Sequence, residues 1–173
     1  GGLLALGIQK GDRVALLSES RIDWVVSELA ILHSGAVCVP LSILLKEGAD
    51  LKFRLDHSES RWIITSRNQY GKIRQIRQEL STLEKVILLD PVEDKESADV
   101  LLDEVKVKGV VYLEENAEKF DEIIHSARPD TIANICYTSG TTADPKGILI
   151  THRNYTANIE QTLTLLEVPS WWT

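Results

Sequence analysis

The feature that most limits the fold of this chain is the regular alternation of short apolar runs with helix-like segments. The first run, Arg13–Leu17, is typical of a strand. Ser20 has the character of a helix N-cap, and Gly35 that of a C-terminal stop. A second apolar run, Ala36–Val39, follows at once. Strands separated by single helices need crossover connections, so this alternation predicts βαβ units and a parallel arrangement.

Within the first predicted helix, the apolar residues Val25, Leu29 and Leu32 recur at helical spacing. The alternation then continues along the chain, except that residues 90–103 lose the rhythm and suggest a surface excursion. We therefore expect an α/β fold, in which helices flank a mostly parallel sheet in three α/β/α layers. Further strands are expected at Trp62–Thr65, Val86–Leu89 and Ile132–Tyr137, and further helices around 46–56, 73–80 and 101–127.

Composition excludes some classes of function. The formal net charge is -7, which argues against a general nucleic-acid binder, because phosphate neutralisation needs clustered Lys and Arg. The longest apolar runs fall short of the roughly 18 residues that a membrane-spanning helix needs. Cys38 and Cys136 each lie inside an apolar run, so we expect buried thiols in a reducing compartment rather than a disulfide or a metal pair.

One segment carries the chemistry: Tyr137–Gly147, with four Ser or Thr hydroxyls, two glycines, one proline and Lys146 between two apolar runs. Glycine permits a tight loop whose backbone N–H groups converge on an anion. Hydroxyls donate to phosphate oxygens, and lysine adds a compact positive charge. Composition alone would favour a simple turn. The segment is also not a Walker A loop, because that pattern requires Gly-Lys-Ser/Thr at its end, whereas here Pro145 precedes the lysine and glycine follows it.

The order of residues in this segment strongly resembles the phosphate-binding signature of the adenylate-forming superfamily, which includes acyl-CoA synthetases, luciferases and peptide-synthetase adenylation domains. The family pattern is Tyr-Thr-Ser-Gly-Thr-Thr-Gly-x-Pro-Lys-Gly, and this chain departs from it at Ala143. Alanine disfavours positive φ. If the backbone needs positive φ at this position, alanine changes the loop geometry slightly. We expect function to survive this change. The segments Gly11–Leu16, Leu32–Leu41 and Ile148–Asn154 extend the resemblance over most of the chain.

The resemblance implies that residues 1–173 are a fragment of the large N-terminal, AMP-binding domain, without the C-terminal domain. It implies ATP-dependent activation of an acid to acyl-AMP and then acyl-CoA, with coenzyme A as co-substrate and Mg²⁺ relieving charge on the polyphosphate. The residues expected to bind the ATP phosphates are Thr138, Ser139, Gly140, Thr141, Thr142 and Lys146.

The same resemblance places the catalytic lysine, the magnesium-binding glutamate and the adenine contacts downstream. We therefore expect neither a catalytic residue nor a metal ligand in this chain, and no activity of the fragment alone. The acidic helical stretch 93–127 and the segment Asn154–Asn158 look most like bacterial long-chain-fatty-acid CoA ligases. The expected partners are ATP, a fatty acid and coenzyme A, with no nucleic acid. The expected location is cytoplasmic, with peripheral membrane contact and oligomeric state left open.

Three alternatives stay open. The first is an amino-acid or aryl-acid adenylation domain, which shares the loop. The second is a non-catalytic nucleotide-binding module. The third, a dinucleotide-binding dehydrogenase, is disfavoured because Gly-x-Gly-x-x-Gly does not follow the first predicted strand. His152 and Arg153, at a predicted helix start, either approach phosphate or acyl groups or serve in capping and packing.

Overall fold

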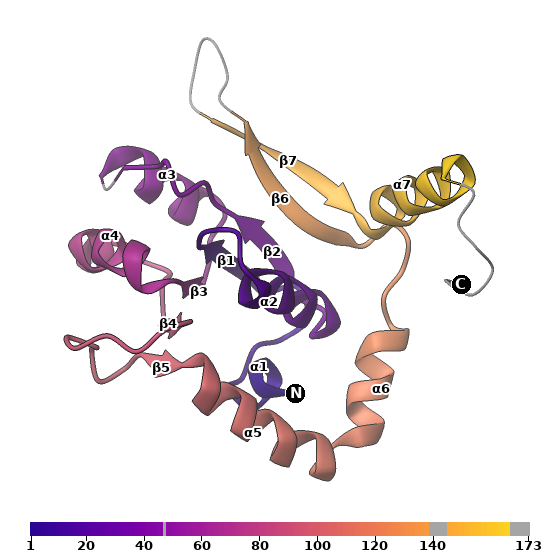
Figure 1. Ribbon diagram of the computed structural model, residues 1–173, viewed down its shortest axis with the longest axis horizontal. Coiled ribbons are helices and arrows are strands. Elements are labelled where there is room, and N and C mark those ends of the chain that lie inside the picture. Colours follow the sequence, from indigo (N-terminus) through magenta and orange to yellow (C-terminus); the bar gives the residue numbers. More distant parts are fainter. Residues whose placement is uncertain (47, 139–144, 167–173) are drawn as a thin grey trace.

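The computed structural model describes residues 1–46, 48–138 and 145–166 of the chain. The strands are β1 (Arg13–Leu17), β2 (Val37–Pro40), β3 (Trp62–Thr65), β4 (Lys85–Leu88), β5 (Val100–Leu101), β6 (Ile132–Thr138) and β7 (Lys146–Thr151). They form one seven-stranded sheet in the order β5-β4-β3-β1-β2-β6-β7 (Figure 1). Neighbouring strands run parallel except for β6 and β7, which are antiparallel. The expectation of a mostly parallel sheet is confirmed.

The central strand β1 shows why both faces of the sheet must be covered. Its Val14 and Leu16 side chains join one core cluster. Those of Ala15 and Leu17 join the other. Successive side chains of a strand point to opposite faces, and these four are fully buried. A strand buried on both faces reads as a continuous apolar run, which is how this segment appears in the sequence.

Helices cover the two faces and give the three layers. The helices are α1 (Gly2–Ala5), α2 (Ile22–His33), α3 (Ala49–His57), α4 (Arg67–Ile76), α5 (Leu102–Glu115), α6 (Ala117–His125) and α7 (His152–Leu165), with a 3₁₀ turn at Arg77–Glu79. On one face, α1, α2 and α5 contribute Leu3, Ile31 and Val105 to the core. On the opposite face, α3 and α4 contribute Leu55 and Ile73. The expected α/β/α layering is therefore confirmed.

The start of α2 differs from the prediction. Ser20 is predicted as the N-cap, and this is wrong: the helix begins at Ile22, with Arg21 in the N-cap position and no side-chain capping bond. The backbone of Arg21 is extended, with φ -156° and ψ 166°. Its guanidinium donates to Asp90 and to Asp23, each at 2.8 Å. An extended backbone is usual for an N-cap residue, and the ion pairs with Asp90 and Asp23 accompany this helix start.

The end of α2 agrees with the prediction, but its packing does not follow from the spacing. Gly35 follows the helix with φ +73°, a conformation that glycine adopts without strain. Val25 and Leu29, which give the helix its spacing, are 51% and 49% exposed. Ser27 and Ile31 are the buried residues instead. The pattern therefore identifies the helix correctly but not the side that packs on the sheet.

The stretch predicted as a surface excursion, residues 90–103, contains the edge strand β5. Val100 pairs in parallel with Ile87 of β4. Just before it, Asp99 is 1% exposed and accepts hydrogen bonds of 2.7 Å from both Tyr70 and Arg77. A buried carboxylate needs such partners, so this pair of donors fixes the stretch against α4 and the turn after it. The helices that follow are present as predicted.

Candidate functional site

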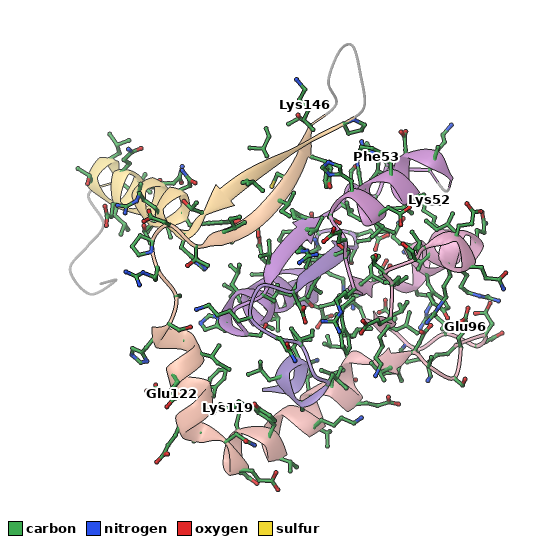
Figure 2. All side chains as sticks on the ribbon, turned by 180° about the vertical axis from the view of Figure 1, so that it is seen from behind. Lys52, Phe53, Glu96, Lys119, Glu122 and Lys146 are labelled. Carbon is green, nitrogen blue, oxygen red and sulfur yellow. The ribbon has the colours of Figure 1, made fainter. Side chains whose placement is uncertain are left out.

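The predicted phosphate loop is the connection between β6 and β7. Thr138, the last residue of β6, pairs in register with Lys146, the first residue of β7. Both side chains are exposed, and Figure 2 shows Lys146 at the loop end of the hairpin. Directly opposed residues of an antiparallel pair project from the same face, so a hydroxyl and an ammonium group flank the loop together. The predicted residues Ser139, Gly140, Thr141 and Thr142, and also Ala143, lie outside the described residues.

The hairpin leaves the sheet before it reaches the loop. Strand β6 pairs with β2 at Cys38 and Asn134. Residues 135–138 pair only with β7 in the described part of the sheet, after a register irregularity between Ile132 and Asn134. Such irregularities bend a strand and increase its twist. Figure 1 shows the result, because the loop end of β6 and β7 stands away from the other strands.

Helix α3 contacts the hairpin through Tyr137, the residue before Thr138. The Tyr137 hydroxyl lies 2.8 Å from Nδ1 of His57, and the two rings meet edge to face with centroids 5.7 Å apart. The Arg54 guanidinium carbon lies 5.8 Å from the centroid of the Tyr137 ring. Phe53 stacks on His57 at 5.3 Å between centroids. Burial raises the pKa of the Tyr137 phenol, so the hydroxyl is neutral and can donate or accept.

A second set of contacts holds the opposite face of β6. Asn134, which is 2% exposed, donates its side-chain amide to Glu28 of α2 at 3.1 Å and to the hydroxyl of Tyr155 in α7. The Tyr155 hydroxyl in turn donates to the Glu28 carboxylate at 3.3 Å. Burial, and then the neighbouring Glu28 charge, raise the pKa of Tyr155. This triad joins α2, β6 and α7 at the point where the hairpin separates from the sheet.

The two cysteines lie near this triad as free thiols. Cys38 is fully buried, as predicted, whereas Cys136 is only half-buried. Burial raises the pKa of both thiols, and the charge of Glu28 contributes in each case. Both are therefore protonated at neutral pH, in agreement with packing rather than reactivity.

His152 and Arg153 take up packing and pairing roles. The His152 side chain helps to line an apolar cavity of about 220 Å³ together with Leu29 and Ile123. Arg153 forms an ion pair with Asp130 at 3.1 Å. Both residues follow β7, whose six residues span roughly 20 Å at the usual rise per residue. That length separates them from the phosphate loop at the other end of the strand.

The site contains residues that sequence reasoning missed. Nothing in the sequence indicated that His57, which is exposed, contacts Tyr137, and Arg54, Glu28 and Asn134 carried no signal. Phe53 and Arg54 lie four and three residues before His57, so helical spacing brings them near it, but Tyr137 lies 80 residues beyond His57 in the chain. Among the described residues there is no group of three or more His, Cys, Asp or Glu side chains able to hold a metal ion. In the same part of the chain, the helices are too short or too polar to cross a membrane.

Comparison with known proteins places this chain in a family. The model of the AMP-binding enzyme family matches residues 1–171. Fatty acyl-CoA synthetase A of Dictyostelium discoideum is 29% identical over 161 residues, covering 91% of this chain and 23% of that protein. Crotonobetaine/carnitine–CoA ligase of Salmonella arizonae is 33% identical over 155 residues, covering 87% of this chain and 28% of that protein. This chain thus spans about a quarter of the length of these relatives.

Solved structures agree with this assignment. The anthranilate CoA ligase AuaEII, crystallised with anthranoyl-AMP, superposes with a TM-score of 0.70 and 25% identity, covering 92% of this chain and 28% of that chain. The seven-stranded, mostly parallel sheet is therefore that of the N-terminal domain of adenylate-forming enzymes, of which 173 residues make up a part. The chain belongs to the AMP-binding enzyme family.

Proposed function

We propose that this chain carries the ATP-phosphate loop of an AMP-forming acid–CoA ligase whose substrate is a long-chain fatty acid. The observation that carries the proposal is the register pair of Thr138 and Lys146, which brackets a Ser/Thr/Gly loop at the exposed end of a hairpin. An exposed hydroxyl and an exposed ammonium group on one face suit an anion such as a phosphate group. Membership of the AMP-binding family agrees with this assignment.

The chemistry that this loop would support is the departure of pyrophosphate. A carboxylate attacks the α-phosphorus of ATP, giving acyl-AMP, and the thiol of coenzyme A then displaces AMP. Negative charge builds up on the leaving pyrophosphate, and preorganised N–H, hydroxyl and ammonium donors stabilise it. We assign contact with the β- and γ-phosphates to Thr138, Ser139, Gly140, Thr141, Thr142 and Lys146.

The described residues at the base of the loop, Thr138 and Lys146, fit phosphate better than a metal ion. Mg²⁺ prefers carboxylate and water oxygens, and the described part of the loop base offers a hydroxyl and an ammonium group. We therefore assign no Mg²⁺ ligand among the described residues at the base of the loop. The relatives named as a fatty acyl-CoA synthetase and a carnitine–CoA ligase support the class of acid–CoA ligases. The choice of a fatty acid as the substrate is the narrower part of the proposal.

We also propose that residues 1–173 form part of the large N-terminal domain, with the C-terminal domain outside this chain. Exposed apolar side chains on α2, β7 and α7 support this, among them Ile22, Leu149 and Ile159 at 83%, 57% and 55% exposure. Extended apolar surface usually marks an interaction site. The fragment alone would then neither adenylate nor form a thioester, which turnover by the purified chain would contradict.

An aryl acid is the second candidate substrate. The similarity to an anthranilate CoA ligase, whose crystals contain anthranoyl-AMP, favours it over an amino acid. Both candidates share the loop and its chemistry. They differ in the acid that supports adenylation, so one assay separates them.

ATP–pyrophosphate exchange by the full-length protein tests the proposal. Exchange supported by long-chain fatty acids is the expected result, and exchange only with aryl or amino acids would move the assignment to the alternative. Lys146→Ala should lower exchange about 10²-fold, the usual cost of removing one preorganised donor from a developing charge. Lys119, an exposed lysine of α6 (Figure 2), provides the matched control Lys119→Ala, which should leave exchange unchanged. Equal activity of both variants would contradict a role of Lys146 in the reaction.

A further inference from the structure

The geometry points to α3 as the support that sets the position of the phosphate loop: we propose that His57 and Arg54 are positioning residues that act on the loop through Tyr137. The inference rests on the proposed function, because it assigns a role to residues outside the loop itself. His57 and Arg54 do not touch the phosphates in this proposal. They hold β6, the strand that leads into the loop with the phosphate donors.

The loop end of the hairpin needs such a support. The parallel pairing of β6 with β2 is confined to Cys38 and Asn134. Beyond that point, residues 135–138 have only β7 as a neighbouring strand in the described structure. A two-stranded hairpin on its own is only marginally ordered in water. A loop that must present donors in a fixed arrangement therefore depends on whatever else the hairpin touches.

Tyr137 is the side chain that makes this contact. Together with Ile135, it packs against the core cluster on the α3 side of the sheet. Its hydroxyl meets Nδ1 of His57 at 2.8 Å, which fixes the tilt of the ring. Arg54 lies against the face of the same ring, and its own guanidinium donates to the backbone carbonyl of Asp50 at 2.7 Å. Arg54 is 8% exposed, so it forms part of the packed interior rather than a mobile surface charge.

The same ring also touches the other strand of the hairpin. Tyr137 faces Gly147 in the antiparallel register. A Cβ atom built on Gly147 would lie 3.6 Å from two atoms of the Tyr137 ring and 3.0 Å from Ile135. The ring therefore fills the space above Gly147, the direct neighbour of Lys146. A shift of α3 would therefore move the Tyr137 ring, and with it the residues at both ends of the loop, Thr138 on β6 and Lys146 on β7.

A histidine packed on a tyrosine could instead contribute to stability alone. The two roles differ in what a mild substitution changes. His57→Phe keeps an aromatic ring between Phe53 and Tyr137 but removes the hydrogen bond, and Tyr137→Phe removes it from the other side. Loss of one neutral hydrogen bond should alter the presentation of the loop by about 5-fold in an equilibrium or rate constant. A purely structural role would lower the melting temperature without a selective effect on ATP.

The experiment uses the full-length protein and three variants: His57→Phe, Tyr137→Phe and the double variant. In ATP–pyrophosphate exchange, each single variant should raise KM for ATP about 5-fold and leave KM for the acid unchanged. The double variant should be no worse than either single one, because both remove the same bond. His125, an exposed histidine of α6 that contacts Asp121, gives the matched control His125→Phe with no effect expected.

Amide hydrogen exchange of the free protein gives a readout that does not need activity. In His57→Phe, the peptide covering residues 136–148 should exchange faster than in the wild type, whereas His125→Phe should leave it unchanged. Unchanged protection, or faster exchange with an unaltered KM for ATP, would overturn the positioning role. Absence of pyrophosphate exchange by the wild type with every acid would count against the proposed function, and the amide exchange would still decide whether α3 holds the loop.

Discussion

Asn134 donates a side-chain hydrogen bond of 3.1 Å to Glu28, a residue 106 positions earlier in the chain. Asn134 lies on β6, and Glu28 lies on α2. This bond, with Tyr155 as the third member, ties an outer helix to the strand that leads into the proposed phosphate loop. The polar triad therefore lies where the hairpin turns away from the sheet.

Removal of the Asn134 amide should destabilise the fold. In Asn134→Ala, the half-buried Glu28 carboxylate loses a donor, and the Tyr155 hydroxyl loses another. A group left unsatisfied in this way usually costs about 1–3 kcal/mol. Urea denaturation should report a loss of that size in the free energy of unfolding. Asn158→Ala, on the exposed face of α7, should stay within about 0.5 kcal/mol of the wild type, and an equal loss in both variants would contradict the role of the triad.

The raised pKa of Tyr155 predicts a loss of stability in alkali. In the unfolded chain a tyrosine loses its proton near pH 10, whereas burial and the Glu28 carboxylate keep Tyr155 protonated in the fold. The stabilisation is complete below about pH 10 and declines as the pH rises above it, because the unfolded state then releases the proton first. Tyr155→Phe should show a shallower decline in the free energy of unfolding between about pH 9 and pH 11. A slope identical to that of the wild type would show that Tyr155 does not carry the effect.

The cysteines should differ in their accessibility to a thiol reagent. Cys136 is half-buried, and Cys38 is fully buried within β2. Both thiols have raised pKa values, so labelling of the native protein near neutral pH should be slow for each. Cys136 should be labelled first, and Cys38 only on unfolding. In Cys136→Ser, the faster labelling of the native protein should disappear. If the faster labelling remained, Cys38 rather than Cys136 would be the more accessible thiol.

Ala143→Gly restores the family pattern at the one position where the loop departs from it. Glycine would relieve strain only if the backbone there requires positive φ. We expect the KM for ATP of the full-length enzyme to change less than about 5-fold, because an alanine at negative φ carries no strain, whereas one held at positive φ costs roughly 1–2 kcal/mol. A larger improvement would show that Ala143 constrains the loop.

The sequence predicts the local features of this structure well. The strand Trp62–Thr65 and the stop at Gly35 depend on short-range patterns, and both are present. The loop carries an ordered string of residues, which is why its phosphate-binding role could be proposed from a resemblance. Strand β5 was missed because two residues are too short to show a period. Ser20 was misassigned because the helix begins one residue later, after Arg21, whose ion pair with the distant Asp90 is invisible in the local pattern.

The support of the loop could not be predicted in the same way. His57 and Tyr137 are 80 residues apart, and nothing in either local pattern indicates the other. The exposed face of α2 is a related case. Val25 and Leu29 have the spacing of a buried helix face, but the sheet packs against Ile31 instead. Periodicity reports that a helix has an apolar side and does not say which neighbour covers it.

Strand β7 lies at the end of the described sheet, and this position has a consequence for handling the protein. An edge strand presents backbone donors and acceptors that a second polypeptide can match. On β7 this edge also carries Ile148 and Leu149, which are 48% and 57% exposed. A chain of this length expressed by itself therefore offers a template for self-association at the strand that begins at Lys146. Protein concentration, as well as sequence, will therefore determine whether the edge of this hairpin stays unpaired in solution.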